Sequence, residues 1–127
     1  MPRVYLLHFA ALALSAAHHV DHIARATHVG WPVTPDVTTF TYTLLIYPII
    51  GLGFLLRSRA YWLVAATGGL LLLTGVHFGP VAVESPADIV SGYRDAALGY
   101  AALLDLIALV AVLLIIVVVY LRGGAKV

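Results

Sequence analysis

Histidines and carboxylates are concentrated in one short part of the chain. Residues 15–28, SAAHHVDHIARATH, contain four of the six histidines together with Asp21 and Arg25. His18 and His22 are four positions apart, so on a helix their imidazoles lie on one face and can bind the same metal ion. Asp21 and Arg25 have the same spacing, which is typical of an ordinary surface ion pair. The segment therefore predicts one wall of a metal site at a helix end.

Two residues far along the chain are candidates for the same site. His77 and Asp105 lie in apolar segments, where an ionisable side chain is costly unless it faces a partner. We therefore predict one metal site with the ligands His18, His22, His77 and Asp105. Additional ligands, or acceptors for the second ring N–H of a ligand histidine, are expected among His19, Asp21, His28, Asp36 and Glu84. The chain has no cysteine, so the ligands are nitrogen and oxygen atoms and the ion is Zn, Cu or Fe.

Haem b is the main alternative to a bare metal ion. A four-helix membrane bundle can bind haem with one histidine from each of two facing helices. His77 would then pair across the bundle with His18, His19 or His22, and the haem propionates would pair with Arg25 or Arg94. A small proton- or metal-coupled transporter and a purely structural membrane subunit are the remaining alternatives.

Composition indicates that these residues belong to an integral membrane protein. The chain has 127 residues, of which 62% are hydrophobic and 10% charged, and its mean hydropathy is +1.02. A soluble domain of this size needs more charged residues to cover its surface. The net charge of +1 is too small and too scattered for nucleic-acid binding. The predicted partner is therefore the lipid bilayer.

Four apolar segments are long enough to cross a membrane, namely 4–26, 35–56, 60–78 and 86–121. Residues 34–36 (TPD) and 85–88 (SPAD) each combine a capping hydroxyl, a first-turn proline and an early acid, as expected where a helix starts. We predict an all-α fold, a four-transmembrane-helix antiparallel bundle that forms a single domain over 1–127.

Basic residues predict the orientation of this bundle. One side carries Arg3, Arg57, Arg59, Arg122 and Lys126, whereas the other side carries only Arg25 and Arg94. We therefore expect both termini in the cytoplasm, in the cell membrane of a prokaryote. With a rise of about 1.5 Å per residue, the four predicted ligands then lie in one layer near the non-cytoplasmic face. His8 lies near the cytoplasmic face and is not expected to share the site.

The first 17 residues also have the basic start, apolar middle and small-residue end of a signal peptide. Cleavage after Ala17 would leave His18 at the new N-terminus, but we interpret the segment as the first helix. Little of the chain lies outside the predicted spans. The sequence therefore predicts an accessory subunit of a larger membrane complex, or a homo-oligomer, rather than an independent enzyme.

Overall fold

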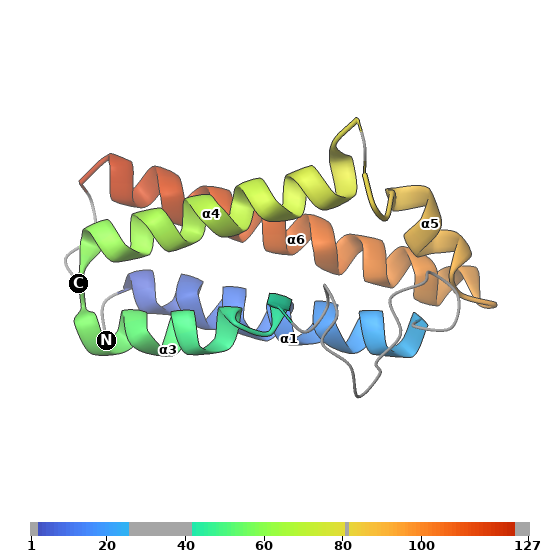
Figure 1. Ribbon diagram of the computed structural model, residues 1–127, viewed down its shortest axis with the longest axis horizontal. Helices are drawn as coiled ribbons and strands as arrows, with labels where there is room; N and C mark the ends of the chain where they lie inside the picture. The colour runs from blue at the N-terminus through green and yellow to red at the C-terminus, as the bar shows by residue number, and fades with distance from the viewer. Residues whose placement is uncertain (1–2, 26–41, 81, 124–127) are drawn as a thin grey trace.

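The computed structural model describes residues 3–25, 42–80 and 82–123. In this part the chain is helical and contains no β-strand, so the predicted all-α class is confirmed. The helices, labelled in Figure 1, are α1 (Arg3–Arg25), α3 (Ile46–Leu56), α4 (Arg59–Phe78), α5 (Pro86–Ser91) and α6 (Ala96–Leu121). Residues 26–41 lie outside this description, and with them His28, Asp36 and the predicted helix start at 34–36.

Helices α1 and α4 agree closely with the predicted segments 4–26 and 60–78. Helix α4 begins where the Ser58 side chain accepts a hydrogen bond from the backbone N–H of Tyr61. The residue before Ser58 is Arg57, which has a left-handed backbone (φ 48°) and ends α3. A left-handed residue commonly terminates a helix, so α3 and α4 are joined by a tight turn.

The predicted continuous helix over 35–56 is wrong in its described part. Helix α3 begins only at Ile46, after a turn at residues 44–45. Pro48 explains this start, because proline has no N–H to donate to the carbonyl of Leu44. As the third residue of α3, Pro48 stands in the first turn, where helical N–H groups need no intrahelical acceptor.

The helix predicted over 86–121 is instead two helices, α5 and α6. The predicted start is confirmed, because Ser85 and Asp88 form a reciprocal capping box and Pro86 follows Ser85 directly. Helix α6 has its own cap, since the Asp95 side chain accepts a hydrogen bond from the backbone N–H of Ala97 at 2.8 Å. This second cap allows the chain to turn before α6 begins.

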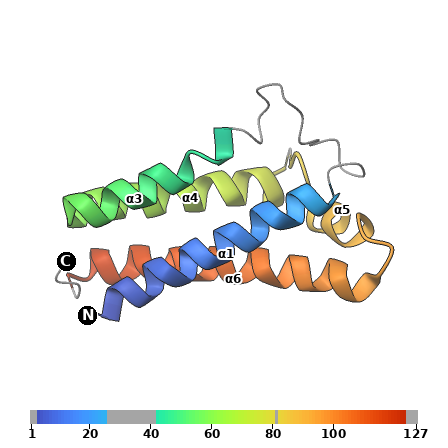
Figure 2. The same cartoon turned by 90° about the horizontal axis from the view of Figure 1, so that it is seen from below.

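Helix α6 is the centre of the packing. It contacts α1 and α4, and α5 folds against its first turns, while α3 packs on α4. Figures 1 and 2 show α1 and α6 running in opposite directions, so that the start of α1 and the end of α6 lie at the same end of the molecule. At this end α3 comes very close to α4, because a Cβ atom at Gly53 would lie only 2.6 Å from the Trp62 ring.

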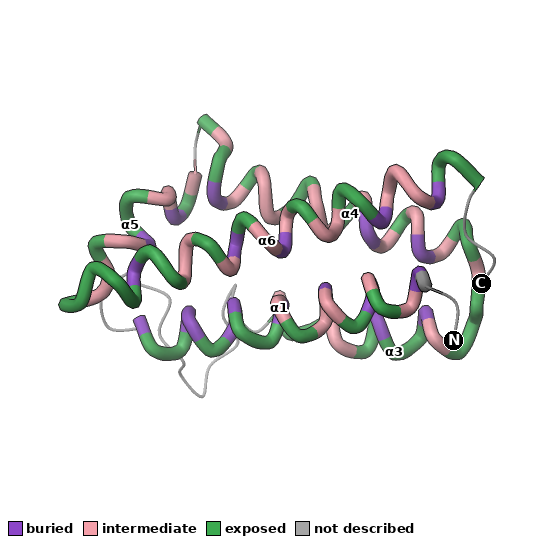
Figure 3. The backbone as a smooth tube through the Cα atoms, turned by 180° about the vertical axis from the view of Figure 1, so that it is seen from behind, coloured by how far each residue is buried: buried purple, intermediate pink, exposed green. Residues whose placement is uncertain are grey.

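Apolar side chains fill the interior and also cover the outside. The buried core consists of Val4, Ala11, Ile50, Trp62, Ala66, Leu109, Ile116 and Tyr120. Large apolar residues are also exposed on the outer faces, for example Leu55, Val64 and Leu104, and Figure 3 shows exposed positions along every long helix. Helices α4 and α6 are each long and apolar enough to cross a membrane.

Candidate metal centre

Three buried histidines from two helices come together between α1 and α4. His18 and His22 are on α1, His77 is in the last turn of α4, and each offers one ring nitrogen within 4.8 Å of the other two. These three residues are called the histidine cluster below. Their exposed fractions are only 5%, 4% and 2%. The predicted proximity of three of the four proposed ligands is thus present in the structure.

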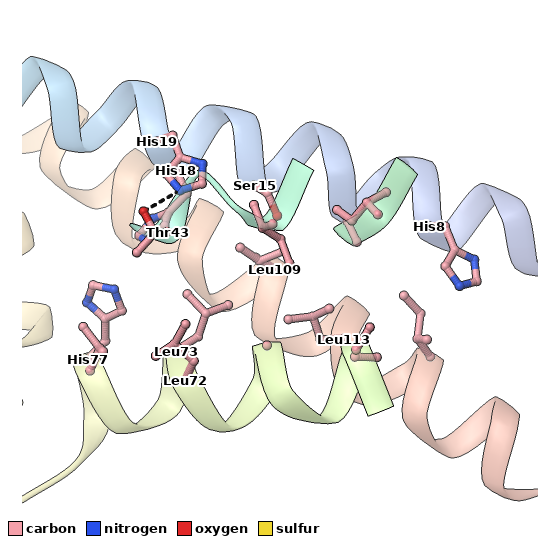
Figure 4. Close-up of a pocket in the computed structure, with 18 of the residues that line it drawn as sticks. His8, Ser15, His18, His19, Thr43, Leu72, Leu73, His77, Leu109 and Leu113 are labelled. Carbon is pink, nitrogen blue, oxygen red and sulfur yellow. Dashed lines mark hydrogen bonds between the residues drawn. The ribbon is translucent and has the colours of Figure 1, made fainter. Parts of the chain in front are cut away.

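The spacing within the histidine cluster resembles that of ligands on one ion. The Nε2 atoms of His18 and His22 are 3.1 Å apart. Two nitrogens bound to one tetrahedral zinc ion at about 2.0–2.1 Å would be about 3.3 Å apart. The ring centroid of His77 is 5.1 Å from that of His18 and 5.9 Å from that of His22. In Figure 4 the His77 side chain points from α4 toward α1.

The chain after α4 holds the His77 ring in place. His77 Nδ1 donates a hydrogen bond to the backbone carbonyl of Glu84 at 2.9 Å. This contact forms because the chain turns back on α4, where the N–H of Val83 donates to the carbonyl of Val76 at 2.9 Å. With the proton on Nδ1, the lone pair of His77 is on Nε2. Metal-binding histidines are commonly oriented by this kind of hydrogen bond.

Glu84 places a carboxylate directly behind two of the histidines. Its Oε2 lies 3.6 Å from His22 Nδ1 and 3.7 Å from His77 Nδ1, and the residue is 1% exposed. A carboxylate on the Nδ1 side favours a proton there, which leaves the Nε2 lone pair for a metal. Glu84 is the nearby carboxylate that the sequence analysis had proposed only as an additional ligand or hydrogen-bond partner.

Arg25 connects this carboxylate to a second one. The fully buried guanidinium donates from Nε to Asp21 Oδ1 at 2.8 Å, and its NH1 and NH2 groups pair with Glu84 and Asp21. The expectation of a surface pair between Asp21 and Arg25 is therefore wrong, because Glu84 and Tyr93 cover it. Two carboxylates and one guanidinium carry a formal charge of −1, which favours a cation at the neighbouring histidine cluster.

Tyr93, between α5 and α6, completes this ion-pair network. Its hydroxyl donates to Asp21 Oδ1 at 2.6 Å, and the Arg25 guanidinium lies 6.0 Å from its ring centroid. Burial, followed by the hydrogen bond to Asp21, raises the pKa of Tyr93 to about 12. The hydroxyl is thus a protonated donor at neutral pH. Its contribution to stability is complete below the unfolded pKa of about 10 and is lost as the pH rises through the folded value.

Asp105, the fourth predicted ligand, does not join the histidine cluster. Among the described residues the three histidines alone form a group with ligand atoms within 4.8 Å of one another. Asp105 lies on α6, and its Oδ2 is buried without a hydrogen-bond donor in the described part of the chain. The carboxylate beside the histidines comes instead from Glu84, since the turn after α4 carries this residue back to His77.

His19 is directed away from the histidine cluster toward the start of α3. Its Nδ1 lies 2.8 Å from the Tyr47 hydroxyl and its Nε2 lies 3.1 Å from Thr43 Oγ1. Both ring nitrogens therefore have hydrogen-bond partners on the other side of α1. Arg94, proposed as a propionate partner, is exposed in the turn before α6.

The geometry favours a bare ion over haem. A bis-histidine haem uses two nitrogens, one from each face of its flat ring, whereas here three histidines each bring a nitrogen to one point. His18 and His77, one of the predicted haem pairs, have ring centroids only 5.1 Å apart. Arg25, the other proposed propionate partner, is bound by Asp21 and Glu84.

The sequence named Glu84 among the expected acceptors, but its position beside His22 and His77 depends on a turn. The sequence contained one usable signal, namely that only residues 79–84 separate the end of α4 from the helix cap at Ser85. So short a connection keeps residue 84 close to the last turn of α4, where His77 is located. Tyr93 had no such signal, since its contact with Asp21 depends on the packing of α5 and α6.

No family model matches this sequence, and no curated protein or solved structure matches it either.

Proposed function

We propose that this chain is an integral membrane protein that binds one transition-metal ion through His18, His22 and His77. The observation that carries the proposal is the convergence of three buried imidazoles, from two helices, with ring nitrogens within 4.8 Å of one another. Buried polar groups are costly unless they are paired. One shared cation satisfies the facing nitrogens of all three rings.

The donor set favours an ion that accepts neutral nitrogen ligands. Imidazole suits zinc, copper and iron, and three protein ligands leave one position of a tetrahedral ion open. The formal charge of −1 on Asp21, Arg25 and Glu84 partly balances the charge of a divalent ion. The nearby Glu84 carboxylate also supports the proton positions on His22 and His77 that binding requires.

The membrane part of the proposal is supported by α4 and α6, which have the length and hydropathy of membrane-spanning helices. We propose four spans, with both termini in the cytoplasm of a prokaryotic cell and the metal on the non-cytoplasmic side. The arginines at one end of the molecule, Arg57, Arg59 and Arg122, favour that end as cytoplasmic. An accessory subunit or a homo-oligomer suits a chain with so little mass outside the spans.

The proposal is tested by measuring metal content. The detergent-purified protein is stripped with a chelator, reloaded with zinc, desalted and analysed for metal. We expect one zinc ion per chain in the wild type and almost none in His22→Ala or His77→Ala, because two histidines and water bind far more weakly than three histidines.

The matched control is His19→Ala, which removes an imidazole beside His18 that bonds to Tyr47 and Thr43 instead. This variant should keep its zinc. Circular dichroism and gel filtration check that all variants are folded. Full zinc occupancy in both His22→Ala and His77→Ala would contradict the proposal.

A further inference from the structure

A cavity of about 150 Å³ lies between the helices, next to the histidine cluster. It is bounded by α1, α3, α4 and α6, and it has His18, His22 and His77 at one end and His8 at the other. Figure 4 shows His77 and His18 far from His8, with Leu109, Leu73 and Leu113 between them. The histidine cluster therefore opens onto an apolar space inside the helices.

Small residues create this space. Ala11 on α1, together with Ala65, Ala66 and Gly69 on α4, lines the cavity where larger side chains would fill it. A cavity of about this volume with mainly apolar walls can hold a molecule of the size of benzene. An unfilled cavity also lowers stability, because the side chains around it lose contacts. The walls thus favour an apolar occupant of about six carbon atoms.

The two ends of the cavity differ in their hydrogen-bonding capacity. At the far end both nitrogens of His8 are engaged, Nδ1 with the Val4 carbonyl at 2.7 Å and Nε2 with the Tyr120 hydroxyl at 3.2 Å. At the near end His18 Nδ1 is buried and has no hydrogen-bond partner in the described part of the chain. Of the two ends, the near end is therefore the one that favours a polar group on the occupant.

We propose that this cavity binds one small uncharged molecule with an apolar body of about six carbon atoms and a single polar group that faces the histidine cluster. A charged molecule is excluded, because the alanine, leucine and isoleucine walls cannot replace its hydration. This proposal rests on the proposed function in one respect: when the metal is bound, the polar group takes its open position.

The outer face of α4 is the entry side that the lining residues favour. Leu72 lines the cavity and is nevertheless 56% exposed, so the cavity lies directly behind the outer surface of this helix. In a membrane this surface faces acyl chains, where uncharged amphiphiles of this size dissolve readily. The surroundings of α4 and the walls of the cavity therefore both favour an uncharged, mainly apolar molecule.

The probe for this inference is 1-hexanol, labelled with ¹³C at both ends and titrated into the detergent-purified protein. Two neighbouring glycines offer a matched pair of variants. Gly69 lines the cavity, and a Cβ there would meet only Leu113 at 3.6 Å, so the side chain in Gly69→Leu can enter the space. Gly68 is exposed and has nothing within 4 Å of the same Cβ position, so Gly68→Leu adds equal bulk outside.

Binding is followed by nuclear Overhauser contacts between hexanol and the protein. We expect C1 protons to contact the rings of His18 and His77, and the terminal methyl group to contact Trp62 near His8. Gly69→Leu should weaken binding at least about tenfold, whereas Gly68→Leu should bind as the wild type does. Equal binding by the two variants, or the reverse orientation of hexanol, would overturn the inference.

Metal content measured on the same samples reports on the proposed function separately. Hexanol contacts in a protein that takes up no metal would support the cavity site and contradict the metal site. Bound metal without hexanol contacts would overturn the cavity site and leave the metal site standing.

Discussion

The two ends of α1 place the same side chain in opposite chemical situations. His8 and His18 are both buried, with exposed fractions of 2% and 5%. His8 has a hydrogen-bond partner on each nitrogen, and its ring centroid lies 3.8 Å from that of Trp62. His18 faces two other histidines, and its Nδ1 has no hydrogen-bond partner in the described part of the chain. Burial alone therefore does not identify a binding residue, whereas the partners of each nitrogen do.

The surroundings of the two ends differ in the same way. Around His8 the neighbours are apolar and aromatic. The Tyr120 hydroxyl donates the one hydrogen bond that His8 Nε2 can accept. Around the histidine cluster, Asp21, Arg25 and Glu84 form a buried ion-pair network that is held together by several hydrogen bonds. Such a network is costly to bury, and its formal charge of −1 favours the cation that we propose at the histidine cluster.

The largest effect is expected from breaking this network at Arg25. Arg25→Leu leaves the carboxylates of Asp21 and Glu84 buried without their guanidinium. We expect the free energy of unfolding to fall by about 3–5 kcal/mol, as it does when one partner of a buried ion pair is removed. Unfolding in detergent, followed by circular dichroism, measures this change.

Arg94→Leu is the control for that experiment, because Arg94 is exposed. A surface substitution of this kind should change stability by less than about 0.5 kcal/mol. If Arg25→Leu behaves like Arg94→Leu, the two carboxylates are not buried as described.

Stability measured with and without zinc distinguishes the role of His8 from that of His18. Without metal, His8→Ala should lower stability by about 3 kcal/mol, since it leaves the buried Tyr120 hydroxyl unpaired and opens a cavity. His18→Ala should cost less, because it removes an imidazole with one unsatisfied nitrogen.

Zinc at about 100 times its dissociation constant should then stabilise the wild type and His8→Ala by about 2.7 kcal/mol each. His18→Ala should gain almost nothing from zinc, because a ligand is missing. Equal stabilisation of all three proteins would show that zinc binds elsewhere.

The smallest effect is expected at the hydrogen bond between Tyr120 and His8. Tyr120→Phe removes one hydroxyl, whose oxygen is 3.2 Å from His8 Nε2, and keeps the buried ring. Stability should fall by about 1 kcal/mol, the usual net value of one hydrogen bond, and zinc content should not change. The exposed Tyr100 provides the control Tyr100→Phe, for which no measurable change is expected. A loss of zinc in Tyr120→Phe would mean that the two ends of α1 are coupled.

Local features of the fold were predictable because they depend on short sequence spacings. The apolar runs of α1 and α4 predicted both helices, and the spacing of Ser85, Pro86 and Asp88 predicted the start of α5. The break before α6 was missed, because the long apolar run from residue 96 concealed the cap at Asp95. A helix cap competes with helix continuation, and only the packing of α5 on α6 decides between them.

The candidate site was predictable in part for the same reason. His18 and His22 share a face of any helix, and counting the helical rise brought His77 to the same level. The same count also included Asp105, which does not join the histidine cluster. Depth along a helix says nothing of its rotation or of the turns between helices, so the count could not separate Asp105 from the three histidines or select Glu84 among the expected acceptors.

The sequence by itself determined that the chain is helical, that no thiolate takes part in its chemistry, and that two histidines lie on one face of α1. These properties follow from composition and from spacings within one helix. Only the tertiary structure decided which histidine nitrogens have hydrogen-bond partners and which face the other histidines. The partners that decide this, Tyr120 for His8 and Glu84 for His22 and His77, come from distant parts of the chain and meet the rings only when the helices pack.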